Sequence, residues 1–100
     1  MIKMLAAAAL VTVMAAPAAP SNQQSTALSA SQIRVIWQDN SSNETGFEVT
    51  DGSVTWTVGA NTTRFVNSLL ASKTTKCYRV RAYNLGGKSA WTPFACATTL

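Results

Sequence analysis

The sequence contains no histidine and is poor in charged residues. Of its 100 residues, 8 are Lys or Arg and 4 are Asp or Glu, which gives a net charge of +4 at pH 7. Histidine is the commonest general base near neutral pH and the commonest transition-metal ligand. Its absence counts against enzymes that depend on an imidazole, and we expect neither a metal site nor a cofactor.

The four acidic residues do not suggest a catalytic centre either. Asp39 and Glu44 share one polar stretch and could form the carboxylate pair that glycosidases use. A capping role in a loop explains Asp39 and the neighbouring Asn40 better, while Asp51 fits a turn and Glu48 a solvent-facing strand position. The oxygens of this stretch lack the ligand spacing of a calcium loop. We therefore predict no catalytic residue and no enzymatic activity.

No apolar run is long enough to cross a bilayer. The longest, Met4–Met14, is shorter than the roughly 20 residues that a span requires. Lys3 precedes it and small residues follow it, a layout typical of a secretory signal peptide, which we predict over residues 1–18. We favour cleavage after Ala18, which leaves small residues at both recognition positions, with cleavage after Ala15 as the alternative. The mature chain is then expected outside the cell, with no membrane span.

Basic residues are few and scattered. Loss of the leader removes Lys3 and leaves seven basic residues, spread from Arg34 to Lys88, against all four acidic ones. Nucleic-acid-binding proteins cluster Lys and Arg on one face, so we expect no nucleic-acid partner. A mildly basic balance favours solubility and weak attraction to acidic surfaces. We expect a monomer whose partner is an extracellular protein or polysaccharide.

The chain beyond the leader alternates as β-strands do. Residues 19–26 are polar and aperiodic, which predicts a flexible linker, so that 27–100 form the domain. Period-two alternation then predicts six strands, a weak seventh over 27–30, and no helix. Seven short strands separated by turns predict an all-β antiparallel sandwich. The six clear strands are predicted at 33–38, 47–50, 53–58, 63–67, 77–84 and 89–98.

One hairpin provides a register for the core. The pair Asp51-Gly52 predicts a two-residue turn. It would place Val49 opposite Val54 and Phe47 opposite Trp56, so that the large apolar side chains share one face. Together with the other alternations, this gives a predicted core of Trp37, Phe47, Val49, Trp56, Phe65, Leu70, Tyr78 and Val80.

The last predicted hairpin brings the two cysteines together. An even cysteine count in an exported chain favours a disulfide. If Gly86-Gly87 forms the turn, Cys77 lies directly opposite Cys96, within reach of a disulfide. Pro93 cannot donate a ladder hydrogen bond, so this last strand is expected at the edge of a sheet.

The outward side of the same hairpin carries a candidate binding face. Arg79, Arg81 and Tyr83 alternate along the predicted strand and share one side of it. Arg and Tyr are enriched at protein interfaces. The alternative is a solvated surface with a weak ion pair to Glu48. Trp91 could lie in the core or point outward as a platform on which sugar rings stack.

Two motifs resemble those of fibronectin type III domains, most closely the versions common in secreted bacterial proteins. They are Ile33-x-Val35-x-Trp37-x-Asp39-Asn40-Ser41 followed by Asn43-Glu44-Thr45-Gly46-Phe47, and Tyr78-Arg79-Val80-Arg81-Ala82-Tyr83-Asn84 followed by Gly87-x-Ser89-Ala90-Trp91. The resemblance extends from about residue 27 to 98. It implies a seven-stranded immunoglobulin-like sandwich.

The chain departs from the family pattern at one corner. The family usually carries a tyrosine six residues after a leucine, and the tyrosine hydroxyl pins this corner. Leu70 fits the leucine position, but Lys76 stands in the place of the tyrosine. We therefore expect a looser corner. Three glycosylation acceptor sequons begin at Asn40, Asn43 and Asn61, and a bacterial source, which the resemblance favours, would leave them unused.

The resemblance implies a contact-making function. We expect a secreted, non-catalytic fibronectin type III module that mediates protein or carbohydrate contacts at the cell surface or in the extracellular space. The alternative is a secreted inhibitor of an extracellular enzyme that uses the end loops of the sandwich. A hydrolase built on the loop carboxylates is a remote third possibility. Fold alone does not choose among these.

Overall fold

The structure is a computed structural model that describes residues 14–100, so most of the predicted signal peptide lies outside the described residues. Within this range the chain forms eight strands and no helix, and therefore no helix that could cross a membrane. The strands are β1 (Ser21–Ala27), β2 (Ile33–Gln38), β3 (Gly46–Thr50), β4 (Thr55–Gly59), β5 (Arg64–Asn67), β6 (Thr75–Asn84), β7 (Gly87–Lys88) and β8 (Ala95–Thr98).

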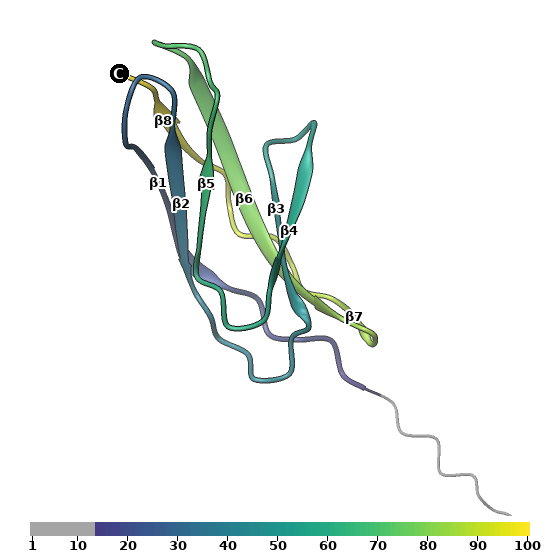
Figure 1. The fold of residues 1–100 in the computed structure, drawn as a ribbon. Coiled ribbons are helices and arrows are strands. Elements are labelled where there is room, and N and C mark those ends of the chain that lie inside the picture. Colours follow the sequence, from purple (N-terminus) through teal and green to yellow (C-terminus); the bar gives the residue numbers. More distant parts are fainter. Residues whose placement is uncertain (1–13) are drawn as a thin grey trace, which may run out of the picture.

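The strands form two antiparallel sheets that face one another (Figure 1). One sheet has the order β1-β2-β5 and the other the order β4-β3-β6. Both β7 and β8 pair with β6, along the edge of β6 that faces away from β3. This is the predicted antiparallel sandwich. The last predicted strand is divided into β7 and β8, which gives eight strands in place of seven.

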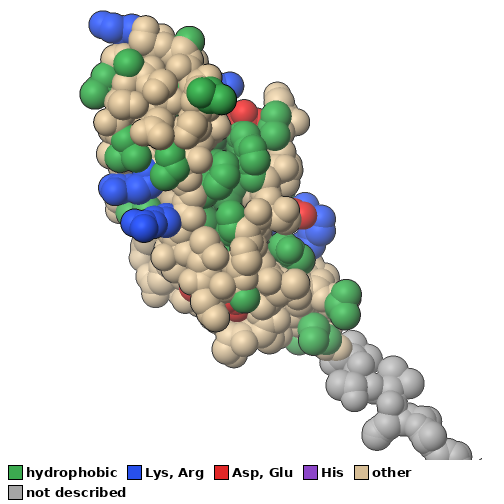
Figure 2. Space-filling view, in the orientation of Figure 1, with side chains coloured by type: hydrophobic (Ala, Val, Ile, Leu, Met, Phe, Trp, Pro, Cys, Tyr) green, Lys and Arg blue, Asp and Glu red, His purple; other side chains and the backbone are tan. Residues whose placement is uncertain are grey.

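The core comes from alternate residues of the three central strands. The buried side chains are Ile33, Val35 and Trp37 of β2, Phe47 and Val49 of β3, and Tyr78, Val80 and Ala82 of β6. Trp56, Phe65 and Leu70 are partly buried and pack against this cluster. The space-filling view shows hydrophobic side chains reaching the surface between the edge strands β4 and β5 (Figure 2). There the rings of Trp56 and Phe65 lie 5.0 Å apart between their centroids.

The linker predicted over 19–26 and the weak strand predicted over 27–30 are both wrong, because residues 28–32 lie outside any strand and β1 occupies residues 21–27. This strand pairs antiparallel with β2, with Thr26 opposite Arg34 and Ala27 opposite Ile33. The Ser25 hydroxyl donates a hydrogen bond to the carbonyl of Ala95 on β8, at 2.8 Å. Backbone pairing at a sheet edge does not require large apolar side chains, so the polar composition misled the sequence interpretation. The domain therefore begins before residue 27.

The predicted register of the β3–β4 hairpin is also wrong, by two residues. Val49 lies opposite Trp56 and Phe47 opposite Val58. Only Gly52 of the two predicted turn residues has positive φ, at 96°, whereas a type I′ turn requires it at both. Instead, one carboxylate oxygen of Asp51 accepts from the backbone N–H groups of Ser53 and Val54, each at 2.8 Å, and closes a longer loop. A shift of two preserves the faces, so the core composition is unaffected.

In the last hairpin two differences offset one another. Asn84 pairs with Gly87, so the turn is Leu85-Gly86 and not Gly86-Gly87. Further along, Tyr78 pairs with Ala95 and Cys77 with Cys96. Two extra residues therefore protrude between β7 and β8, and the cysteines still lie opposite one another. Pro93 falls in this irregular segment at the edge of the sheet.

The corner between β5 and β6 is fixed by other bonds than the missing tyrosine would make. Thr99, which is 2% exposed, donates its hydroxyl to the Ala71 carbonyl at 2.7 Å and accepts from the Thr74 N–H at 2.9 Å. Nδ2 of Asn67 donates to the Tyr78 hydroxyl at 2.7 Å. The corner is therefore hydrogen-bonded without the tyrosine, and its looseness stays a prediction.

Candidate functional site: an arginine–aromatic face on β6

The three residues of the predicted binding face lie on the outward side of β6. Their neighbours on β3 are Thr50 beside Arg79, Glu48 beside Arg81 and Gly46 beside Tyr83. Residues 78, 80 and 82 of the same strand are buried, as the pleat of a strand requires. All three predicted side chains are therefore fixed on one face by a central strand of the sandwich.

Two aromatic rings cover the arginines. The guanidinium carbon of Arg79 lies 4.8 Å from the ring centroid of Trp91 and 4.6 Å from that of Phe94. The guanidinium carbon of Arg81 lies 4.1 Å from the Trp91 centroid. The face is thus a ladder in the order Phe94, Arg79, Trp91, Arg81, held by cation–π attraction. Trp91, whose direction the sequence left open, points outward.

The irregular segment between β7 and β8 positions these rings. Thr92, which is 4% exposed, points inward, and its hydroxyl accepts from the backbone N–H of Val80 at 2.9 Å. The Ser89 hydroxyl accepts from the N–H of Ala82, also at 2.9 Å. In a regular ladder these two N–H groups of β6 would donate to backbone carbonyls of the neighbouring strand. Here the hydroxyls of Thr92 and Ser89 accept from them instead. Because Thr92 points inward, its neighbour Trp91 is directed outward over β6.

The two arginines of the ladder differ in whether a carboxylate neutralises them. Nε of Arg81 lies 2.8 Å from Oε1 of Glu48, and Nζ of Lys88 lies 3.1 Å from Oε2 of the same carboxylate. Burial would raise the pKa of Glu48, but the hydrogen bonds and charges of Arg81 and Lys88 lower it below its usual range. Arg79, in contrast, forms no ion pair within residues 14–100. The guanidinium between the two rings therefore has no counter-charge from the described chain.

Tyr83 is placed beside the ladder by a glycine. A Cβ at Gly46 would collide with the backbone carbonyl of Val58 and would lie 3.1 Å from the Tyr83 hydroxyl oxygen, so the glycine also leaves space for the Tyr83 side chain. No ring contact joins Tyr83 to Trp91 or Phe94 among the described aromatic pairs. The structure thus brings Arg79 and Arg81 into one cluster and leaves Tyr83 at its end.

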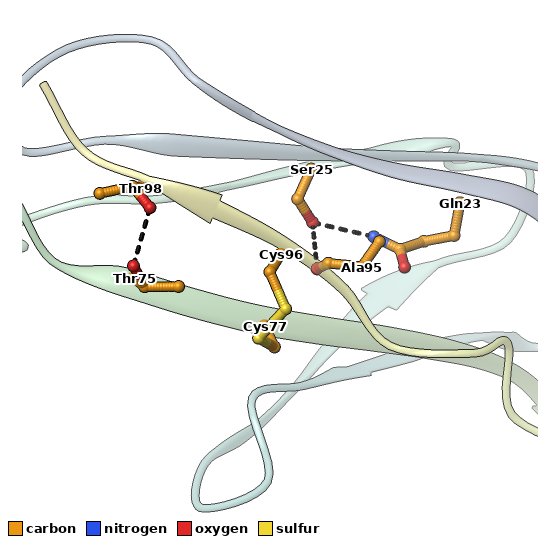
Figure 3. Close-up of a disulfide and its surroundings, with 7 residues drawn as sticks. All are labelled: Gln23, Ser25, Thr75, Cys77, Ala95, Cys96 and Thr98. Atoms are coloured by element: carbon orange, nitrogen blue, oxygen red, sulfur yellow. Dashed lines mark hydrogen bonds between the residues drawn. A yellow bond between two sulfur atoms is a disulfide. The ribbon is translucent and has the colours of Figure 1, made fainter.

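The disulfide borders the same face. Cys77 and Cys96 are bonded across β6 and β8, with their Cα atoms 3.9 Å apart (Figure 3). On one side of it the hydroxyls of Thr75 and Thr98 share a hydrogen bond of 2.7 Å, and on the other Ser25 is bonded to Ala95. These links tie the edge strand β8 to both sheets. Because β8 begins at Ala95, directly after Phe94, these links also restrain the position of Phe94.

The loop carboxylates serve a structural role. The Ser41 hydroxyl donates to Glu44 at 2.7 Å, and the N–H of Asn61 donates to the other Glu44 oxygen at 2.9 Å. Asp39 accepts from the backbone N–H of Ser41 at 3.0 Å. Burial alone would raise the pKa of Glu44, but the hydrogen bonds from Asn61 and Ser41 more than offset the effect of burial and hold the pKa at about 2. Glu44, which is 8% exposed, thus joins two loops as a fixed anion.

Neither a cavity nor a metal-binding cluster accompanies this arrangement in the described part of the chain. No pocket is present, and no three His, Cys, Asp or Glu side chains gather closely enough to hold a metal ion within residues 14–100. What the face offers is therefore a flat surface of cations and aromatic rings. The sequence interpretation missed Phe94 and the positioning residue Thr92, and only the spacing of Trp91 and Phe94 around Pro93 could have suggested a shared face.

Comparison with known proteins places this architecture in a class. No protein-family model matches the chain. Among solved structures, FN3tt is similar at a TM-score of 0.69 and 20% identity, over 86% of this chain and 97% of that one. The chicken CNTN1 FN1–FN3 domains match at a TM-score of 0.73 and 19% identity, over 84% and 33% of the two chains. The class is the immunoglobulin-like β-sandwich. Within it, the chain has the fibronectin type III fold.

Domains A168–A170 of titin match at a TM-score of 0.63 and 25% identity, over 83% of this chain and 32% of that one. In sequence, the chain is 35% identical over 88 residues to an alpha-amylase of Niallia circulans, a match that covers 84% of this chain. It covers only 7% of the amylase. The similarity therefore concerns one short segment of a much longer enzyme.

Proposed function

We propose that the chain is an exported, non-catalytic fibronectin type III module that binds an acidic polysaccharide through the arginine–aromatic face of β6. The observation that carries the proposal is Arg79, a guanidinium fixed between the rings of Trp91 and Phe94 and free of any carboxylate in residues 14–100. Arg recognises carboxylates with two parallel hydrogen bonds. Phe94, which is 47% exposed, offers a ring beside it for the apolar face of a sugar.

The rigidity of the face favours binding. Arg79 and Arg81 are held by their rings, and the rings are held by Thr92, Ser89 and the disulfide-linked β8. Side chains that are already ordered lose less conformational entropy when a ligand binds. A polymer with regularly spaced carboxylates could thus be held without a cavity.

A polysaccharide partner is supported by the sequence similarity to part of an alpha-amylase, a carbohydrate-acting enzyme. Export is supported by the leader-like N-terminus and by the disulfide, since disulfides persist in oxidising compartments. The involvement of Asp39 and Glu44 in loop hydrogen bonds supports a non-catalytic role.

Retention on immobilised polyuronate tests this proposal. We expect Arg79→Ala to lose most of the retention of the wild-type protein, and added salt to weaken wild-type retention because it screens charge. Arg64→Ala is the matched control, since Arg64 is an exposed arginine on β5 of the other sheet. Equal losses of retention in both variants would show that retention depends on net charge alone. Undiminished retention by Arg79→Ala would refute the role of the face.

A further inference from the structure

The residues directly before β1 belong to the folded domain. Residues 14–20 run as an irregular segment past the β6–β7 turn and the 39–45 loop towards β1 (Figure 1). Pro17 and Pro20 are buried, whereas Ala16 and Ala18 are exposed. This segment therefore packs against the folded domain through two prolines.

Asparagine side chains hold the backbone of this segment. Nδ2 of Asn84 and Nδ2 of Asn43 both donate to the Ala15 carbonyl, at 2.9 and 3.1 Å. Nδ2 of Asn40 donates to the Ala19 carbonyl at 3.0 Å. These amides come from both the 39–45 loop and the end of β6, so the segment joins elements that are distant in sequence.

The β6–β7 turn leaves room for the segment at a glycine. A Cβ on Gly86 would collide with the carbonyl group of Met14. A Cβ on Gly87 would lie 3.5 Å from Cβ of Ala16, in ordinary contact. The absence of a side chain at Gly86 thus permits close approach of two backbones.

We propose that the leader is removed by hydrolysis of the Ala15–Ala16 peptide bond, so that residues 16–20 remain in the mature domain. Cleavage after Ala18, which the sequence pattern favours, would remove Pro17 from its buried position. Cleavage after Ala15 retains both prolines and the hydrogen bond to the Ala19 carbonyl. It gives up the contacts of the Met14 and Ala15 carbonyls, which cleavage after Ala18 would remove as well. Water adds its hydroxyl to the Ala15 carbonyl carbon, which leaves as the carboxylate of the leader, and a proton to the Ala16 nitrogen, which becomes the new amino terminus. The proposal rests on export but not on the identity of the ligand.

Processing variants test the position of the cut. The full chain, Ala15→Leu and Ala18→Leu are expressed in an exporting bacterium, and the N-termini of the exported proteins are sequenced. A bulky residue directly before the cut is not accepted, so Ala15→Leu is expected to block normal processing. The wild type and Ala18→Leu are expected to begin at Ala16. Exported wild type beginning at Ala19 would overturn this proposal alone, whereas an intact Met1 on cytoplasmic protein would overturn export as well.

Exported Pro17→Ser and Ala18→Ser give a second readout that does not depend on the peptidase. With residue 17 retained, Pro17→Ser is expected to change the mass of the exported protein by the difference between the two residues. It is also expected to lower the thermal midpoint by about 5 °C or more, since a buried ring is lost. Ala18→Ser, at an exposed position, should leave the midpoint unchanged. An exported Pro17→Ser protein with wild-type mass and midpoint would overturn the proposal.

Discussion

At the scale of single residues, Trp37 links the two sheets. It belongs to β2, is 5% exposed, and its ring centroid lies 5.5 Å from that of Phe47 on β3 in the facing sheet. We expect Trp37→Ala to cost about 3–5 kcal/mol in the free energy of unfolding, as other large-to-Ala changes in cores do. Trp91→Ala should cost less, because Trp91 covers the outer face of β6. Urea denaturation of both variants checks the order, and a greater loss for Trp91→Ala would contradict it.

Glu44 is the residue whose charge should matter most at low pH. Its pKa of about 2 in the fold lies below the ordinary value of 4.5. A group with a lowered pKa stabilises the fold above its unfolded pKa, and this contribution is lost as pH falls through the folded value. The stability that Glu44 supplies is therefore complete above pH 4.5 and disappears towards pH 2.

The measurement is the pH dependence of the unfolding free energy for the wild type and Glu44→Gln. Because hydrogen bonds to a charged acceptor are lost, the variant should be destabilised at neutral pH by roughly 1.5–3 kcal/mol. Its stability should then vary less than that of the wild type between pH 4.5 and 2. Glu48 and Asp51 also have lowered pKa values and remain in both proteins. Parallel pH curves would show that Glu44 is not the anion described here.

At the scale of elements, the disulfide holds the edge strand β8 against β6. It joins residues separated by 19 positions, and on the chain-entropy estimate a loop of this size stabilises a fold by roughly 3 kcal/mol. Chemical denaturation of Cys77→Ala/Cys96→Ala against the wild type should show a loss of this order. Alkylation supplies the control. Two free thiols in the native exported protein would contradict both the bond and the pairing of β6 with β8.

The strands that the sequence predicts well are those whose alternation reaches the core. Ile33, Val35 and Trp37 mark β2 in this way, and Tyr78 and Val80 mark β6. β1 was missed because its sequence, Ser-Asn-Gln-Gln-Ser-Thr-Ala, contains almost no apolar residue and its stability comes from backbone pairing with β2. Hairpin registers depend on local hydrogen bonds such as those of Asp51, which no periodicity reveals.

The candidate site was predictable only in part for the same reason. Alternation placed Arg79, Arg81 and Tyr83 on one face, and the structure has them there. The covering rings come from an irregular segment held by Thr92 and Ser89 side chains, an arrangement without a sequence periodicity.

At the scale of the whole molecule, the two ends and the two outer faces of the sandwich offer different surfaces to a partner. The end that carries the 39–45 loop is held by Glu44 and covered by residues 14–20. The outer face of the β6 sheet instead displays a fixed arginine that forms no ion pair with any residue of the described range 14–100. A module that binds through this face leaves its end loops unchanged, whereas an enzyme inhibitor of the kind considered above would use those loops.

The most direct test of the account is a map of the bound surface by ¹H–¹⁵N correlation spectra of the exported protein during titration with polyuronate. We predict that the chemical-shift changes cluster on Arg79, Arg81, Trp91, Thr92 and Phe94, weaken as salt is added, and disappear in Arg79→Ala. The amides of β2 and β5, in the other sheet, should not respond. Shift changes confined to the loops 39–45, 59–63 and 84–87 would contradict the proposed face and favour the end-loop mode of an inhibitor.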